Sequence, residues 1–292
     1  MDGAEGDLEG AVEEEAGAAA VVVVSVDSAA EVPEAVARAA AGSKRQCEDA
    51  MIPTSIIDEF VKRVREAGGS NVESVILFGS AVTGDYHQGL SNLNVLCVLR
   101  DSSFQPLRAL FPASKWWDKQ KQPPPLCMTR QELLRSNDVF TIELLDMQQH
   151  HRVLFGDDVL QSMQVPTDLH RVQVEYELRE KLILLRQHIL LASNSDSKLW
   201  DLLLRSAPSF STLFRHALIA LGDGTHIARR EAVHALAQRL GFDASAMSQV
   251  LDVREGKADR KKIGVQDLAA RYLASIEKVT AAVDMALDSA KS

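Results

Sequence analysis

Two asparagines and a Gly-Ser pair form the part of the sequence whose residue types and spacing are best suited to chemistry. Gly79-Ser80 directly follows a run of β-branched and aromatic residues, and Asn92 and Asn94 come shortly afterwards. Where a strand passes through Gly-Ser into a helix, backbone N–H groups and a hydroxyl can hold an anion, and glycine lets that anion come close. The pattern therefore predicts a site for a phosphate-bearing ligand.

The two asparagines alternate with apolar residues in the segment Ser91-Asn92-Leu93-Asn94-Val95. Successive side chains of a strand point to opposite faces, so Asn92 and Asn94 are expected to share one face. Carboxylates at these two positions would hold Mg²⁺ against a triphosphate, because Mg²⁺ is a hard cation that relies on charged oxygen ligands. An amide offers only a neutral carbonyl, so Asn92 and Asn94 are poorer Mg²⁺ ligands than two carboxylates would be.

The elements around this site predict an α/β domain. Val72–Phe78 (VESVILF) and Leu93–Leu99 (LNVLCVL) have the composition of strands, and Val139–Leu145 (VFTIELL) is predicted to be a third strand that carries Glu143. Shorter patterns add helices over 54–67, 103–122 and 130–136, and strands over 126–128 and 152–155.

After Pro166 the patterns are helical only. The spacing predicts a long helix over 167–193 with one apolar stripe, formed by Leu169, Val172, Tyr176, Leu178, Leu182, Leu185, Ile189 and Leu190. Further helices are expected over 198–205, 209–221, 227–240, 244–252 and 265–288. The chain is therefore expected to comprise a disordered acidic tail (1–45), an α/β domain (46–160) and an α-helical bundle (166–290).

Composition limits the classes of protein that fit. The net charge is −9, and residues 1–43 hold ten acidic residues against one basic residue, so general nucleic-acid binding is not expected. Three scattered cysteines are too few for a disulfide framework or a metal cluster. The longest apolar run, Ala18–Val24, is too short to span a membrane, and the acidic N-terminus lacks the basic start of a signal peptide. These features indicate a cytoplasmic protein.

The Gly-Ser element, the spacer and the Asn-Leu-Asn strand resemble the signature of the polymerase-β-like nucleotidyltransferase superfamily. In that superfamily two acidic residues on a strand and a third from a later strand bind two Mg²⁺ ions, and a nucleotide is transferred to a hydroxyl. The chain looks most like the small bacterial forms, such as aminoglycoside nucleotidyltransferases, in which a helical bundle follows the α/β core. The resemblance covers roughly residues 70–156 by motif and 166–290 by organisation only.

This resemblance implies an α+β fold, in which a nucleotidyltransferase-like mixed-sheet domain is followed by an all-α helical bundle. Gly79, Ser80, Asn92 and Asn94 then become nucleotide-binding residues, and Glu143 becomes the candidate third carboxylate and catalytic residue. Asparagine replaces both acids of the motif, so no metal ligand is assigned, and Mg²⁺ is expected only if activity survives.

Three functions fit these residues. The leading hypothesis is a degenerate nucleotidyltransferase that binds a nucleoside triphosphate or regulates another process, with impaired metal-dependent catalysis. The first alternative is an active enzyme that uses Glu143 to transfer a nucleotide to a hydroxyl of a small molecule or protein. The second is a ligand-free interaction module with a protein partner or a second copy of the chain.

Other residues have plainer interpretations beside a functional one. Asp85 could replace a lost ligand or be an exposed loop acid, and Asp146 would face away from Glu143 if both lay on a strand. The remaining candidates are a His150-His151 metal site, base stacking on Trp116-Trp117, and a ribonuclease-like Arg229-x₄-His234 pair. The simpler explanation of Trp116-Trp117 is a helix that is anchored by tryptophan. The simpler explanation of Arg229 is a helix start with solvated arginines.

Overall fold

A four-stranded mixed sheet forms the centre of the first half of the protein. The computed structural model describes residues 53–84, 86–87, 91–223 and 228–289, so the predicted tail and Asp85 lie outside the described residues. The strand order is β3-β2-β1-β4, in which β1 pairs antiparallel with β2 and β4 while β2 pairs parallel with β3. The strands are β1 (Val72–Phe78), β2 (Asn94–Leu99), β3 (Leu126–Thr129) and β4 (His151–Gly156).

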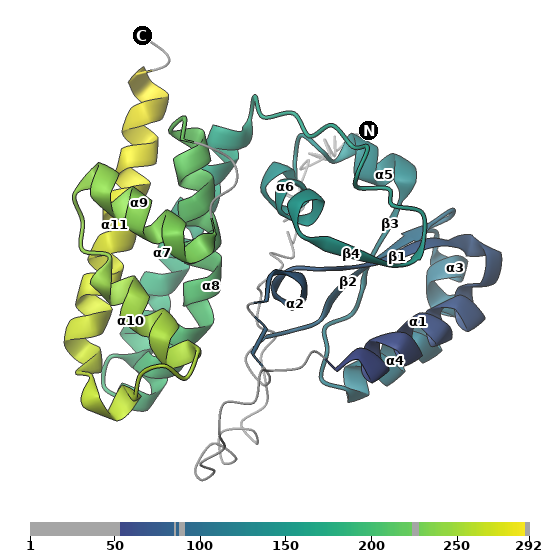
Figure 1. Cartoon of the computed structure of the whole chain (residues 1–292), viewed down its shortest axis with the longest axis horizontal. Helices are drawn as coiled ribbons and strands as arrows, with labels where there is room; N and C mark the ends of the chain where they lie inside the picture. The colour runs from purple at the N-terminus through teal and green to yellow at the C-terminus, as the bar shows by residue number, and fades with distance from the viewer. Residues whose placement is uncertain (1–52, 85, 88–90, 224–227, 290–292) are drawn as a thin grey trace, which may run out of the picture.

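Helices cover both faces of this sheet, which explains why β1 is apolar along its length (Figure 1). On one face Val75 and Leu77 pack in a core with α1 and α4, where the ring of Phe60 stacks on that of Trp117 at 4.2 Å. On the other face Ile76 packs with residues of α5 and α6. The elements of this half are α1 (Thr54–Gly68), η2 (Gly69–Asn71), α2 (Ser80–Thr83), α3 (Phe104–Ala109), α4 (Phe111–Lys119), α5 (Arg130–Arg135) and α6 (Thr141–Gln149).

The prediction of a strand over Val139–Leu145 is wrong, because this segment enters helix α6. Its β-branched residues favour a strand, but short apolar runs do not distinguish strand from buried helix. Leu144 and Met147 are buried at a spacing of three residues, which is the helical period. The predicted single helix over 103–122 is also divided, into α3 and α4, because Pro112 favours the start of a new helix.

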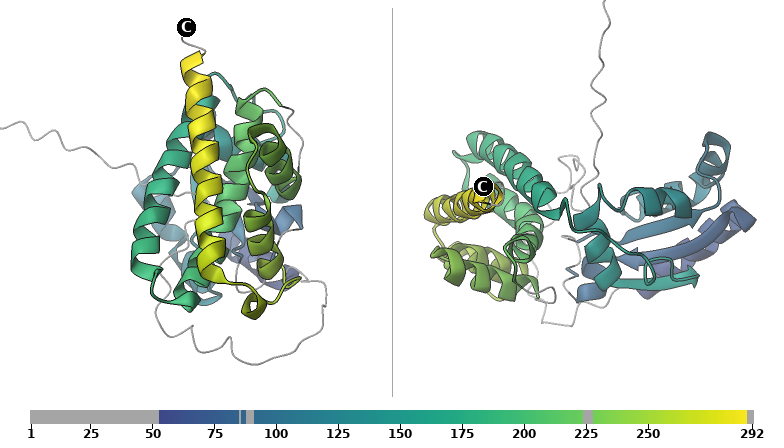
Figure 2. Two further views of the ribbon diagram at one scale, coloured as in Figure 1. Left: turned by 90° about the vertical axis from the view of Figure 1, so that its left-hand side faces the viewer. Right: turned by 90° about the horizontal axis from the view of Figure 1, so that it is seen from above.

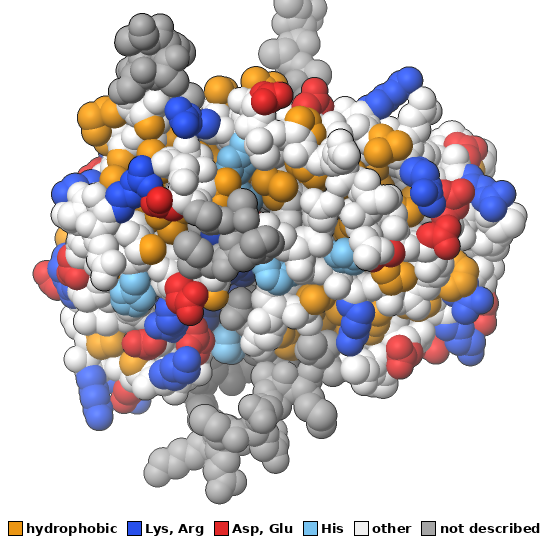
Figure 3. All heavy atoms as spheres, turned by 45° about the horizontal axis from the view of Figure 1, so that its top comes forward, with side chains coloured by type: hydrophobic (Ala, Val, Ile, Leu, Met, Phe, Trp, Pro, Cys, Tyr) orange, Lys and Arg blue, Asp and Glu red, His pale blue; other side chains and the backbone are white. Residues whose placement is uncertain are grey.

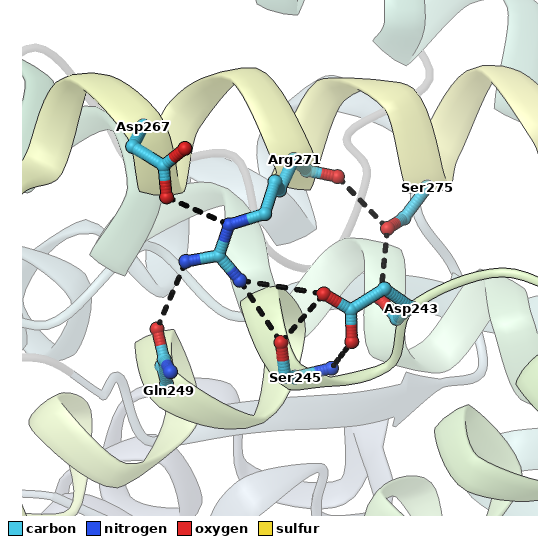
Figure 4. Close-up of polar contacts among 6 residues, drawn as sticks. All are labelled: Asp243, Ser245, Gln249, Asp267, Arg271 and Ser275. Carbon is cyan, nitrogen blue, oxygen red and sulfur yellow. Dashed lines mark hydrogen bonds and ion pairs between the residues drawn. The ribbon is translucent and has the colours of Figure 1, made fainter.

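The second half is a bundle of helices, as predicted. It consists of α7 (His170–Ala192), α8 (Asp196–Ala220), α9 (Arg229–Leu240), α10 (Ser245–Arg254), the short η3 (Arg260–Lys262) and α11 (Val265–Ser289). The polar cluster in Figure 4 fixes α10 and the turn before it to α11. There Arg271 of α11 donates to Ser245 Oγ at 2.9 Å, and Ser275 Oγ donates to the carbonyl of Asp243 at 3.2 Å.

Helix α8 runs through Pro208, although separate helices were predicted before and after this residue. Proline lacks an N–H group, so the carbonyl four residues earlier loses its helical donor. That carbonyl belongs to Leu204, and Arg254 of α10 donates to it through Nη1 at 2.8 Å. The neighbouring helix therefore compensates for the proline, and α8 continues.

The predicted single stripe on α7 is wrong in part. Leu178, Leu182 and Leu185 are buried in the bundle core, whereas four other members of the stripe are exposed, namely Leu169, Val172, Tyr176 and Leu190.

Acidic and basic side chains are interspersed on the face of the molecule shown in Figure 3. Among the described residues, no helix is both long and apolar enough to cross a membrane.

Gly156 provides a test of the register between β4 and β1. Its φ is +78°, and a Cβ there would lie 1.9 Å from the carbonyl oxygen of Glu73. Gly156→Ala should therefore lower the free energy of unfolding by about 1–3 kcal/mol more than Gly256→Ala does. Gly256 is a matched control, because its φ is +71° but a Cβ would meet nothing within 4 Å. Equal losses in denaturant unfolding of the two variants would contradict this register.

Candidate functional site

A cleft lies between the sheet domain and the helical bundle. Its volume is about 1210 Å³, open solvent at its mouth included. The sheet domain contributes the ends of β1 and β2 and one side of α6, and the bundle contributes residues of α7, α8, α9 and α10. All five residues predicted from sequence line it, namely Gly79, Ser80, Asn92, Asn94 and Glu143.

Gly79 joins β1 to α2 and sits against Asn94. It has a φ of +77°, and a Cβ there would lie 3.1 Å from Asn94 Nδ2, so glycine suits both the backbone angle and this approach. Phe78 pairs with Asn94 in the sheet, which brings the Gly-Ser turn and the first residue of β2 to one edge. Helix α2 has only four residues, however, so the helix-terminus contribution expected from the sequence is small.

Glu143 reaches the cleft from helix α6, not from a strand. Gln173 of α7 holds the start of this helix: its Oε1 accepts from the Ile142 N–H at 3.2 Å, and its Nε2 lies 3.4 Å from Glu143 Oε2. Burial, reinforced by the carboxylates of Glu177 and Asp146, raises the pKa of Glu143. Ionisation of this side chain is therefore less favourable than that of a solvated glutamate.

Asp146 links the two halves of the protein. The prediction that it faces away from Glu143 is wrong, because a spacing of three residues places both on one side of a helix. Its carboxylate binds Arg215 Nη2, and its Oδ1 lies 2.8 Å from His216 Nε2. Nδ1 of His216 lies 2.9 Å from His170 Nε2, so a chain of polar contacts runs into the bundle.

Burial and neighbouring charges determine the pKa values of Asp146 and His170 in this chain of contacts. Burial opposes the ionisation of Asp146, but His216 together with Arg215 and Arg229 outweighs it and lowers its pKa to about 2. Burial also lowers the pKa of His170 to about 4, so this ring is neutral at pH 7. Arg215 and His216 expose only 4% and 1% of their surfaces, so their contacts with the carboxylate of Asp146 lie in a water-poor setting.

Four basic side chains of the bundle line the cleft opposite the Gly-Ser turn: Lys181, Arg229, Arg230 and Arg254. Arg230 is paired with Asp252 at 2.9 Å and Glu255 at 2.7 Å, and Lys181 with Glu177 at 3.4 Å. Arg254 reaches across the cleft, with Nη2 3.3 Å from Ser91 Oγ. Arg229 differs from these, because its Nε is buried and has no hydrogen-bond partner in the part of the chain that the structure describes.

The donor set does not fit the Mg²⁺ pair of a nucleotidyltransferase. Asn92 and Asn94 are neutral, the Asp146 carboxylate is occupied by Arg215 and His216, and burial disfavours the charged form of Glu143. Within the described ranges no three His, Cys, Asp or Glu side chains lie close enough together to hold a metal ion. A hard divalent cation therefore lacks the carboxylates on which it depends.

The alternative sites are not assembled. His151 is held by the Met147 carbonyl at 2.8 Å and by Asp158 at 2.9 Å, so it serves the fold. Trp117 is fully buried against Phe60 and offers no surface to a nucleotide base. On α9, Arg229 lines the cleft, but His234 does not and instead lies 3.4 Å from Ser248 Oγ.

Sequence reasoning missed the residues that the bundle contributes to the cleft. Glu177 and Lys181 of α7 lie four residues apart, a spacing that marks one face of a helix but not the direction of that face. Asp146 could have been found with Glu143 if the segment had been assigned to a helix. No local signal places Arg229 or Arg254, because their position depends on how the two halves meet.

Comparison with known proteins agrees with the fold. Residues 57–183 match the family model of the nucleotidyltransferase domain. The solved structure of spectinomycin adenyltransferase from Enterococcus faecialis, determined with ATP and spectinomycin, is similar at 15% identity and a TM-score of 0.48. That similarity covers 77% of this chain and 99% of the other. A search of curated proteins finds no match.

The mixed sheet with a Gly-Ser turn at the mouth of a cleft, followed by an all-α bundle, is the nucleotidyltransferase-like α+β arrangement that was predicted from the sequence. The sequence similarity to the nucleotidyltransferase domain thus spans residues 57–183, which is less than half of the chain.

Asp146→Asn tests whether the link holds the two halves together. The substitution removes the negative charge that the buried Arg215 and His216 contact and should destabilise the protein by about 3–5 kcal/mol. Asp138→Asn, which alters an exposed acid a few residues earlier, should stay within about 0.5 kcal/mol of the parent. Thermal and urea unfolding of both variants measure the difference, and an unchanged Asp146→Asn protein would show that the link is dispensable.

Proposed function

We propose that this protein binds a nucleoside triphosphate in the cleft without requiring Mg²⁺, and that it does not transfer nucleotides by a two-metal mechanism. The observation that carries the proposal is the exchange of charge in the cleft. Neutral amides stand where the family has carboxylates, while basic side chains of the bundle line the same cleft. Removing two negative charges from the sheet side lessens repulsion toward a triphosphate.

Phosphate binding in this cleft has two sources of donors. Val82 and Thr83 donate their N–H groups to the Gly79 carbonyl, so the first source is the backbone N–H groups of Ser80 and Ala81 together with the Ser80 hydroxyl. On the bundle side, the Arg229 guanidinium carries a buried N–H without a hydrogen-bond acceptor among the described residues. A guanidinium binds phosphate oxygens in pairs and keeps its charge at all physiological pH values, so it can neutralise phosphate where a metal cannot be held.

The sugar and base have room and polar partners in the same cleft. Asn92 and Asn94 supply amide donors and acceptors, and Ser209 and Thr212 of α8 line the opposite side. Apolar contacts come from Phe78, Ile142 and Met147. A mostly apolar cleft with a few convergent polar groups is the usual form of a small-molecule site.

Titration of ATP, GTP, CTP and UTP by calorimetry, with Mg²⁺ and with EDTA, tests the proposal. At least one nucleotide should bind, and EDTA should change its Kd by no more than about threefold, which is under 1 kcal/mol. Absence of binding by all four would sink the proposal and favour the interaction module. Transfer of labelled nucleotide that Glu143→Gln abolishes would instead establish the active enzyme.

Arg229→Ala should weaken nucleotide binding about 10- to 100-fold, because a charge-assisted hydrogen bond contributes about 1.5–3 kcal/mol. Arg239→Ala is the matched control: this arginine lies at the other end of α9, where it pairs with Asp223 outside the cleft. The Kd of the Arg239→Ala variant for the nucleotide should equal that of the parent protein. Equal weakening by the two substitutions would indicate a general charge effect and would contradict a phosphate contact at Arg229.

A further inference from the structure

Two cysteines lie opposite each other in the sheet. Cys97 of β2 is the direct partner of Cys127 of β3 in the parallel ladder. Side chains of directly paired residues point to the same face of a sheet, and both cysteines pack in the core that α1 and α4 share with the sheet. The two thiols are in hydrogen-bond contact. The fold therefore brings together two thiols that are far apart in the sequence.

The backbone spacing at this pair suits a disulfide. Neighbouring strands lie about 4.8 Å apart, and disulfides bridge Cα atoms that are about 4.4–6.8 Å apart. The Cβ atoms of bridged cysteines are closer together, at about 3.8 Å on average, so closing the bond requires a small movement of one strand. β3 is free to make this movement, because it lies at the edge of the sheet, where β2 is its neighbour among the described strands.

The two thiols differ in access and in acidity. Cys97 is fully buried, whereas Cys127 is partly exposed. The hydrogen bond with Cys97 lowers the pKa of Cys127, and the same bond, together with burial, raises the pKa of Cys97. A thiolate attacks a disulfide and a thiol does not. Cys127 is therefore the sulfur that meets a reagent from solution, and Cys97 is protected beside it.

We propose that Cys127 and Cys97 form a redox-active dithiol site, which low-molecular-weight disulfides such as oxidised glutathione convert to an intramolecular disulfide. The Cys127 thiolate attacks one sulfur of the reagent, forms a mixed disulfide and expels the first glutathione thiolate. Cys97 then loses its proton and attacks the Cys127 sulfur, which expels the second glutathione thiolate. The two cysteines lose two electrons and two protons, and one molecule of oxidised glutathione becomes two molecules of glutathione.

Proximity favours the second step. The mixed disulfide holds its electrophilic sulfur beside Cys97, and a reaction between groups held in contact has a high effective concentration. Cys97 needs no access to solvent for this step, because its reaction partner is already its neighbour in the sheet. The mixed disulfide should therefore accumulate only when Cys97 is replaced.

The dithiol site lies outside the cleft. Both cysteines belong to the sheet domain, which lies beside the bundle in the right-hand view of Figure 2, and neither lines the cleft. The inference is therefore independent of the proposed nucleotide binding, and its failure would leave that proposal unaffected.

Intact mass spectrometry of the folded full chain, incubated with oxidised glutathione, tests the proposal in a Cys47→Ser background that leaves only the two thiols. The monomer of this protein should lose the mass of two hydrogens, and a peptide map should show Cys97 linked to Cys127. Adding Cys97→Ala should instead trap one glutathionyl group on Cys127. Adding Cys127→Ser should slow the modification of Cys97 at least about tenfold relative to that of Cys127, because burial protects a thiol.

Two controls accompany the measurement. Circular dichroism shows that each variant is folded, and reaction of every remaining thiol in urea shows that the reagent is competent. A stable glutathione adduct on the protein that retains both thiols would overturn the proposal, as would the absence of oxidation in the folded state. Equally fast modification of Cys97 in the Cys127→Ser variant would overturn the role of Cys127 as the attacking sulfur.

Discussion

The contact of Asp146 with Arg215 and His216 is the constraint on which the cleft depends. It joins α6 of the sheet domain to α8 of the bundle, and Arg215 and His216 are almost wholly buried. Buried charges tolerate little displacement, because separating them leaves each ion desolvated and unpaired. The two halves are thereby held at one spacing, and the residues that line the cleft from either side keep their mutual positions.

The electrostatics of the cleft differ from those of a metal-dependent transferase. A metal pair needs a cluster of carboxylates on the sheet, and here the sheet offers amides at Asn92 and Asn94. Two carboxylates of the cleft already have basic partners: Asp146 contacts Arg215, and Glu177 contacts Lys181. Positive charge instead comes from side chains of the bundle, above all Arg229. Under the proposed function, the bundle would supply the counter-charge that the ligand of a metal-binding enzyme receives from its ions.

The sequence predicted what depends on local pattern and missed what depends on tertiary contact. β1, the Gly-Ser turn and β2 were predictable because Val72–Phe78 and its successor combine strand-forming composition with glycine. The helical bundle followed from the change of period after Pro166, whereas the mixed sheet was implied by the resemblance of the Gly-Ser and Asn-Leu-Asn segment to a known superfamily. The segment Val139–Leu145 was wrongly assigned to a strand, because seven residues are too few to distinguish the period of a strand from that of a helix. The exposure of half the predicted α7 stripe, and the arrival of Arg229 at the cleft, depend on packing that no single segment encodes.

Because of Pro208, one carbonyl of α8 receives its hydrogen bond from α10. A proline inside a helix is ordinarily a point of bending, since the preceding turn lacks one hydrogen bond. Here the carbonyl of Leu204 is held by Arg254, whose other amino group meets Ser91 beside the cleft. Arg254 therefore connects the proline turn of α8 to the residues at the cleft through two hydrogen bonds, and displacing its guanidinium would leave the Leu204 carbonyl without this donor.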